Sequence, residues 1–150
     1  MSCSVQVEDF DVGLILNELR TAHPTAGAVV SFIGQVRDVN DGDSVNTLTL
    51  EHYPGMTESA LAAIESEARA RWDLMDSMII HRVGTLKPLD QIVLVAVLSA
   101  HRGEAFRACE FIMDYLKTKA PFWKKEITPT GERWVDAKTS DEKAIDRWKT

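Results

Sequence analysis

The sequence is poor in features that mark several specialised protein classes. It has 2 cysteines in 150 residues, Cys3 and Cys109, so no disulfide framework is expected and a reducing setting is the default. The longest apolar segment, 92–98, is far shorter than a membrane span. The first residues, MSCSVQVEDF, lack the basic start and apolar run of a signal peptide. We therefore expect a cytoplasmic protein with no membrane partner.

Basic charge and familiar motifs are also scarce. The chain has 17 Lys plus Arg against 23 Asp plus Glu, a net charge of −6, and duplex-binding proteins usually carry a basic excess. We therefore expect no nucleic-acid partner. Glycine-rich nucleotide motifs and the common hydrolase signatures do not occur, and the four histidines are scattered singly, so no metal site is expected. Cys109 falls on the apolar stripe of a predicted helix and is interpreted as a core residue, not a nucleophile.

What is present is an ordinary globular composition, 45% hydrophobic and 27% charged. The length predicts a single domain over 1–150, with a possible small hairpin and helix appendage over 123–150. Periodicity predicts helices over 11–20, 58–72, 104–119 and 141–148, and strands over 28–36, 46–53, 78–83, 91–99, 123–128 and 133–137. Strands arrive in pairs between helices. The predicted fold is therefore α+β with mostly antiparallel strand pairs, not a doubly wound parallel sheet.

Several details of this fold are also predicted. Leu14 and Leu19 are expected to face the core, Thr57 to cap the second helix, and 91–99 to be a central strand. Gly34 is a candidate for a bulge or a close backbone approach. Cys3 lies in a terminus that is expected to be mobile.

The segment SAHRGEAF, 99–106, joins a predicted strand to a predicted helix. His101 and Arg102 lie in the link, beside the free N–H groups of the helix. Such a turn is a candidate anion site, to which Arg adds a bidentate donor. Both residues can equally be solvated loop residues.

The segment YLKTKAPFWKKE, 115–126, concentrates lysines around a proline corner. Pro121 turns the chain back, so Lys117 and Lys124 are expected to converge, and neighbouring ammonium groups lower each other's pKa. Alternation places Trp123 on one strand face, expected to be the core, and Lys124 and Glu126 on the other. The alternative is a helix end followed by an edge strand protected by lysines.

The segment GQVRD, 34–38, ends a strand with Arg37. An Arg at this position can clamp an anion, or it can pair with a neighbouring Asp38, Asp41 or Asp43.

Together, GQVRD, LTLEHYPGM at 48–56, SAHR at 99–102 and FIMDYLKTKAPFWKKE at 111–126 resemble the large, catalytic subunit of molybdopterin synthase. The resemblance runs from about residue 26 to 148. It implies an α/β-hammerhead-type fold and a homodimer in which each large subunit binds one small, ubiquitin-like sulfur-carrier subunit, giving a heterotetramer. It also implies a sulfurtransferase. The carrier's C-terminal thiocarboxylate supplies sulfur to cyclic pyranopterin monophosphate (precursor Z), forming the molybdopterin dithiolene with no permanently bound cofactor.

The resemblance also implies roles for particular residues. Lys117 and Lys124 match the family's essential lysines. The matches to its substrate-binding segments and substrate-anion residues are Gln35, Val36, Arg37, His101, Arg102, Lys124, Lys125 and Glu126. Gln35 departs from the family pattern, which has lysine there. Lys119 and Lys138 stand where Arg is usual and are secondary candidates, as are the possible pocket walls Phe32, Met113 and Phe122.

These matches lead to one mechanistic hypothesis and two alternatives. Arg37, His101 and Arg102 are expected to hold the phosphate, while Lys117 and Lys124 act by acid–base or electrostatic catalysis near the thiocarboxylate carbonyl. The first alternative is a non-catalytic dimeric module that binds a ubiquitin-like tail or a pterin phosphate. The second is a phosphoesterase that acts on cyclic phosphates.

Overall fold

The computed structural model describes residues 2–40, 42–135 and 139–149. The larger sheet has the strand order β1 (Ser2–Gln6), β6 (Leu74–Arg82), β8 (Gln91–Ser99), β2 (Ala28–Gln35). The second sheet has the order β10 (Gly131–Val135), β9 (Phe122–Thr128), β5 (Thr47–His52), β7 (Gly84–Leu86). A small hairpin pairs β3 (Val39–Asn40) with β4 (Asp43–Ser44). Of these pairings only β1 with β6 is parallel, which confirms the α+β class with mostly antiparallel strands.

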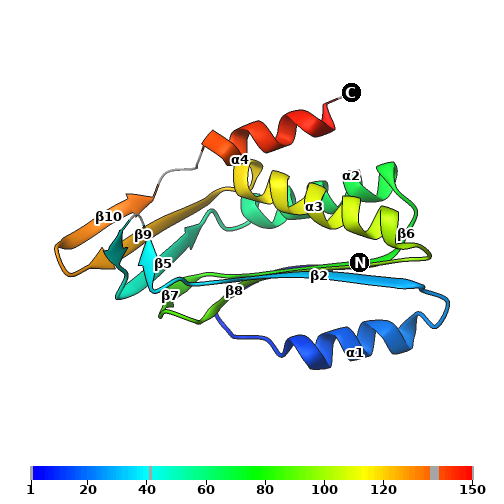
Figure 1. The fold of residues 1–150 in the computed structure, drawn as a ribbon, viewed down its shortest axis with the longest axis horizontal. Coiled ribbons are helices and arrows are strands. Elements are labelled where there is room, and N and C mark those ends of the chain that lie inside the picture. Colours follow the sequence, from blue (N-terminus) through cyan, green and yellow to red (C-terminus); the bar gives the residue numbers. More distant parts are fainter. Residues whose placement is uncertain (1, 41, 136–138, 150) are drawn as a thin grey trace.

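Strand β8 is the centre of the core. Helix α1 (Val12–Ala22) covers one face of the larger sheet, and α2 (Met56–Arg71) and α3 (Arg102–Lys119) cover the other (Figure 1). Alternation sends one set of β8 side chains to α2 and α3, namely Val93, Val95 and Val97, and the other set to the α1 side, namely Leu94, Ala96 and Leu98. Each such buried Val or Leu contributes about 1.5–3 kcal/mol. Burial on both faces explains why 91–99 is almost continuously apolar.

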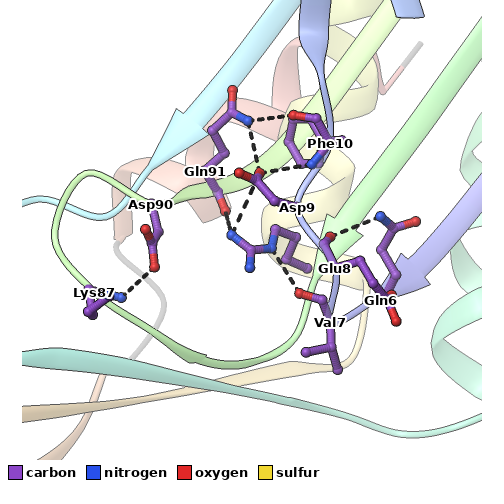
Figure 2. A network of polar contacts seen from close by, with 9 residues as sticks. Gln6, Val7, Glu8, Asp9, Phe10, Lys87, Asp90 and Gln91 are labelled. Carbon is purple, nitrogen blue, oxygen red and sulfur yellow. Dashed lines mark hydrogen bonds and ion pairs between the residues drawn. The ribbon is translucent and has the colours of Figure 1, made fainter.

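The N-terminal residues, which were expected to be mobile, form β1 and pair in parallel with β6. The link from β1 to α1 is tied to the sheet by polar contacts (Figure 2). The Arg82 side chain donates to the Val7 carbonyl at 3.0 Å, and Gln91 Nε2 donates to Asp9 Oδ1 at 3.0 Å and to the Phe10 carbonyl at 2.8 Å. Long-range pairing, which the local pattern does not reveal, therefore fixes this segment.

Two predicted details of the helices are wrong. Leu14 is exposed, whereas Leu19 is buried as predicted. Gly55, with φ 85°, stands at the N-cap of α2, so the Thr57 cap prediction fails. Thr57 is instead a fully buried helix residue whose Oγ1 donates to the Pro121 carbonyl at 2.9 Å.

The C-terminal segment packs onto α3. Helix α4 (Thr139–Ala144) leads into a 3₁₀ turn, η1 (Ile145–Trp148). Trp148 enters the core beside Phe111, and its indole N–H donates to Asp114 at 2.7 Å. The hairpin predicted over 123–128 and 133–137 is present as β9 and β10, although residues 136 and 137 lie outside the described residues.

Candidate active site

A cleft of about 640 Å³ opens where the two sheets and the C-terminal end of α3 meet. This volume falls within the usual range of small-molecule sites. Its walls combine apolar and polar groups. Those used below are Phe32, Gln35, Val36, Arg37, Asn40, His81, Met113, Lys117, Phe122, Lys124, Glu126 and Asp141.

The proline corner brings two lysines to this cleft. Helix α3 ends at Lys119, Ala120 is extended, and β9 runs back along the second sheet from Phe122. Lys117 is exposed and Lys124 is half-buried, and both line the cleft. The predicted convergence of these two side chains on one cavity therefore matches the geometry.

The face of β9 that was expected to be buried is the exposed one. Trp123 is 47% exposed, whereas Glu126 is 4% exposed and lines the cleft beside Lys124. The strand buries charged groups because the cleft lies on that side and hydrogen-bond partners there satisfy the carboxylate. Lys125 consequently projects from the opposite face, 3.7 Å from Glu132, and is not a cleft residue.

Glu126 belongs to a buried polar network. Asn40 Nδ2 donates to its two oxygens at 3.0 and 2.9 Å, and Arg133 Nε donates to Oε1 at 3.0 Å. On the other side of Asn40, Arg37 Nη2 donates to Oδ1 at 2.7 Å. Arg37 thus pairs with Asn40, and not with Asp38 as one sequence alternative held. The side chains of Asp41 and Asp43 are not among those that the structure describes.

His81 is a cleft residue that the sequence did not single out. Its ring is 3% exposed and stacks on Phe122, with centroids 3.7 Å apart and an interplanar angle of 17°. Nδ1 lies 2.8 Å from the Arg82 carbonyl. Because a carbonyl only accepts, Nδ1 carries the proton of the neutral ring and Nε2 carries a lone pair. Burial, with the nearby charges of Lys124 and Lys117, lowers the pKa of His81 to about 4.

His101 and Arg102 lie at the opposite end of α3 from the lysines. His101 occupies the N-cap position and Arg102 begins the helix, and both are exposed. Lys117 lies fifteen positions after Arg102 on the helix, which is about 22 Å at 1.5 Å per residue. Neither residue lines the cleft. Within one chain, His101 and Arg102 therefore lie far from the lysines of the cleft.

Only some of the remaining candidate residues line the cleft. Gln35, Val36, Phe32 and Met113 line the cleft, and Lys119 does not. Lys138 lies outside the described residues.

Gly34, at the end of β2, behaves as expected. The register of β2 shifts between Gly34 and Gln35, and a Cβ at Gly34 would lie 2.9 Å from Val93. Both the bulge and the close approach are therefore present.

The described residues lack two kinds of feature. They contain no group of three or more His, Cys, Asp or Glu side chains placed to hold a metal ion. None of their helices is long and apolar enough to cross a membrane.

Comparison with known proteins gives the family. The family model described as "MoaE protein" matches residues 5–119. The molybdopterin synthase catalytic subunit of Ralstonia nicotianae is 65% identical over 144 residues, covering 96% of this chain and 82% of that protein. The chain belongs to the MoaE family of molybdopterin synthase catalytic subunits.

Solved structures of other proteins share the fold. The molybdopterin biosynthesis MoaE protein from Burkholderia ambifaria has a TM-score of 0.84 and 54% identity, covering 98% of this chain and 97% of that chain. A complex of subunits 1 and 2 of molybdopterin-converting factor from Helicobacter pylori matches at a TM-score of 0.74 and 16% identity, with coverage of 89% and 90%. The latter likeness concerns the fold alone.

Proposed function

We propose that this chain is the sulfur-transferring subunit of a molybdopterin synthase. In this proposal, sulfur passes from the C-terminal thiocarboxylate of a small ubiquitin-like carrier to cyclic pyranopterin monophosphate, forming the dithiolene. One observation carries the proposal: Lys117, Lys124 and Arg37 line a single cleft. A phosphate-bearing substrate needs cationic donors, and the apolar wall of Met113 and Phe122 suits a flat pterin ring.

The two lysines suit acyl chemistry at the carrier's carbonyl carbon. Once the carrier's sulfur has bonded to a pterin carbon, water adds to the carbonyl carbon of the resulting thioester and gives a tetrahedral adduct with a negative oxygen. Collapse of this adduct breaks the bond between that carbon and sulfur, which leaves the sulfur on the pterin and a carboxylate on the carrier. A positioned ammonium group stabilises the negative oxygen most where water is partly excluded. Half-buried Lys124 fits this electrostatic role, and exposed Lys117 can exchange protons with solvent. No protein thiol is needed because sulfur arrives on the carrier. Consistent with this, burial raises the pKa of the Cys109 thiol to about 11.

We also propose that the enzyme is a homodimer in which each copy binds one carrier. Strand β2 is an edge strand of the larger sheet, and it exposes 37% of Val29, 39% of Phe32 and 37% of Ile33. An apolar sheet edge of this kind is suited to pairing with a second chain. The Helicobacter pylori structure with this fold is a two-subunit complex, which supports the compatibility of the fold with a bound small subunit.

The dimer also offers a role for His101 and Arg102. In one chain they stand about 22 Å along α3 from Lys117. If they contact the phosphate, they must reach the cleft of the second copy.

The test of the proposed function is reconstitution. The protein is mixed with thiocarboxylated carrier and cyclic pyranopterin monophosphate, and molybdopterin is assayed. Wild type is expected to form product, and Lys117→Ala to lose about a hundredfold or more in kcat. Lys87→Ala, at an exposed loop position, is the matched control and is expected to keep full activity. Wild type that forms no product, or Lys117→Ala that forms as much as wild type, would contradict the proposal.

The same assay separates the alternatives. A binding module would retain carrier or pterin without forming product. A phosphoesterase would open the cyclic phosphate in the absence of carrier sulfur.

A further inference from the structure

Arg37 is held in the cleft by a neutral amide, although a buried carboxylate lies directly behind that amide. Asn40 Oδ1 accepts from Arg37 Nη2 at 2.7 Å, and Asn40 Nδ2 lies 3.0 and 2.9 Å from the two oxygens of Glu126. Asn40 is 8% exposed and Glu126 is 4% exposed, so solvent screens the contacts between these two side chains poorly, whereas Arg37 itself is exposed. All three side chains line the cleft, and Asn40 lies between Arg37 and Glu126.

The chemistry of the amide sets its orientation. An ionised carboxylate only accepts hydrogen bonds and a guanidinium only donates them. A side chain that joins the two must donate on one side and accept on the other, as asparagine does. An aspartate at position 40 would present a second carboxylate to Glu126 and a full negative charge to Arg37.

The charge of Glu126 is offset by a different arginine. Arg133 Nε donates to Glu126 Oε1 at 3.0 Å, and Arg133 Nη2 donates to the Asn40 carbonyl at 2.8 Å. Among the residues that the structure describes, no carboxylate lies within ion-pair distance of Arg37, although Asp141 lines the same cleft. The buried acid and its arginine therefore form one pair, and Asn40 separates that pair from Arg37.

We propose that Asn40 is a positioning residue that aims Arg37 into the cleft and leaves its positive charge available to a phosphate group. This inference rests on the proposed function, because it names the substrate phosphate as the anion that Arg37 binds. Glu126 acts through Asn40: it fixes the amide, and the amide fixes the guanidinium. An arginine already paired with a carboxylate would bind phosphate more weakly, because part of its charge and one of its donors would be taken.

The test uses Asn40→Asp, which keeps the shape of the side chain and changes its charge. With full-length protein, carrier and cyclic pyranopterin monophosphate, we expect the KM for the pterin to rise about tenfold or more. The Ki of inorganic phosphate as a competitive inhibitor is expected to rise by a similar factor. The KM for the thiocarboxylated carrier is expected to stay within about twofold, because the carrier's carbonyl is assigned to the lysines.

Asn17→Asp is the matched control. Asn17 also accepts from an arginine, with Arg20 Nη2 at 3.0 Å from its Oδ1, but it lies on the exposed surface of α1. This variant is expected to behave as wild type in every measurement.

A double-mutant cycle with Arg37→Ala tells a positioning role from a merely structural one. If Asn40 acts through Arg37, then Asn40→Asp changes the pterin KM by less than about twofold once Arg37 is absent. A thermal melt checks that each variant is folded. If Asn40→Asp does not fold, Asn40→Ala is used in the same double-mutant cycle, because it removes the amide that positions Arg37 and adds no charge.

Two outcomes overturn the inference while leaving the proposed function intact. In the first, wild type forms molybdopterin and the variants at position 40 keep the wild-type pterin KM. In the second, the substitution raises the KM as much without Arg37 as with it. Wild type that forms no molybdopterin instead contradicts the proposed function.

Discussion

At the residue scale, His81 shows how the fold sets the charge state of one side chain. Its ring is buried between the Arg82 carbonyl and the Phe122 ring, with the charges of Lys117 and Lys124 nearby. Each of these ammonium groups disfavours a further positive charge on the nearby His81 ring. The neutral ring can therefore accept a hydrogen bond at Nε2 at physiological pH.

This charge state predicts a pH dependence of stability. The pKa of His81 is lowered from 6.5 to about 4 in the folded protein. The unfolded chain therefore takes up this proton at a higher pH than the folded protein does. The free energy of unfolding should fall as the pH drops from 6.5 toward 4, by up to about 3 kcal/mol from this residue. Urea unfolding of wild type and His81→Gln at pH 7.5 and 4.5 measures the effect.

The drop should be smaller in His81→Gln than in wild type. His101→Gln, which removes an exposed histidine, is the control. Equal drops in wild type and His81→Gln would rule out His81 as a source of the pH dependence.

At the scale of elements, the corner between α3 and β9 is braced by α2. Thr57 Oγ1 donates to the Pro121 carbonyl at 2.9 Å and accepts from the Tyr53 amide at 2.9 Å. Thr57 is fully buried, so water cannot replace these bonds. The start of one helix thereby holds the turn that directs Lys117 and Lys124 into the cleft.

Replacing Thr57 with valine should loosen this corner. Thr57→Val keeps the side-chain volume and removes both hydrogen bonds, so a loss of about 1–3 kcal/mol in unfolding free energy is expected, with a lower kcat. Thr57→Ser keeps the hydroxyl and is expected to retain more of the stability and kcat than valine does. Denaturant titration and the reconstitution assay measure the two effects. A valine variant as stable and as active as the serine variant would show that the contact does not brace the corner.

Most of the helices and strands are predictable from the local sequence pattern. The apolar run at 91–99 and the apolar stripe of α3 define their elements because burial imposes a period along the chain. The Lys117–Lys124 corner is predictable for a similar reason: Pro121 cannot continue the helix.

The wrong or missing predictions concern features that depend on residues far away in the sequence. Strand β1 has few apolar residues and forms through parallel pairing with β6, more than 70 positions away. The face of β9 was assigned from the apolarity of Trp123, whereas the cleft lies on the side of Glu126. The Asn40–Glu126 contact spans 86 positions. No local period encodes such a pair.

At the scale of the whole molecule, the length of α3 separates two sets of candidate residues. Arg102 and Lys117 stand at its two ends, and one chain cannot fold them together. In a two-fold dimer with shared clefts, each cleft would take its lysines from one copy and its His101 and Arg102 from the other.

This arrangement predicts complementation between inactive variants. Lys117→Ala and Arg102→Ala are each expected to be inactive alone. When they are co-refolded in equal amounts, half of the dimers should be hybrids with one intact cleft of two, restoring about a quarter of wild-type activity. Molybdopterin formation by the mixture measures the recovery. Activity no higher than that of either variant alone would contradict a shared cleft.

The placement of the four tryptophans gives the molecule built-in optical reporters. Trp72 and Trp148 pack against Phe111 with ring centroids 5.4 and 5.5 Å away, whereas 47% of Trp123 and 56% of Trp134 are exposed on β9 and β10. Iodide should therefore quench the fluorescence of the strand pair and leave the emission of the core pair nearly unchanged. A carrier that covers these strands would protect the quenchable fraction, and a pterin that fills only the cleft would not. The proposed binding of the carrier and the proposed binding of the pterin can thus be distinguished by tryptophan fluorescence in one unlabelled protein.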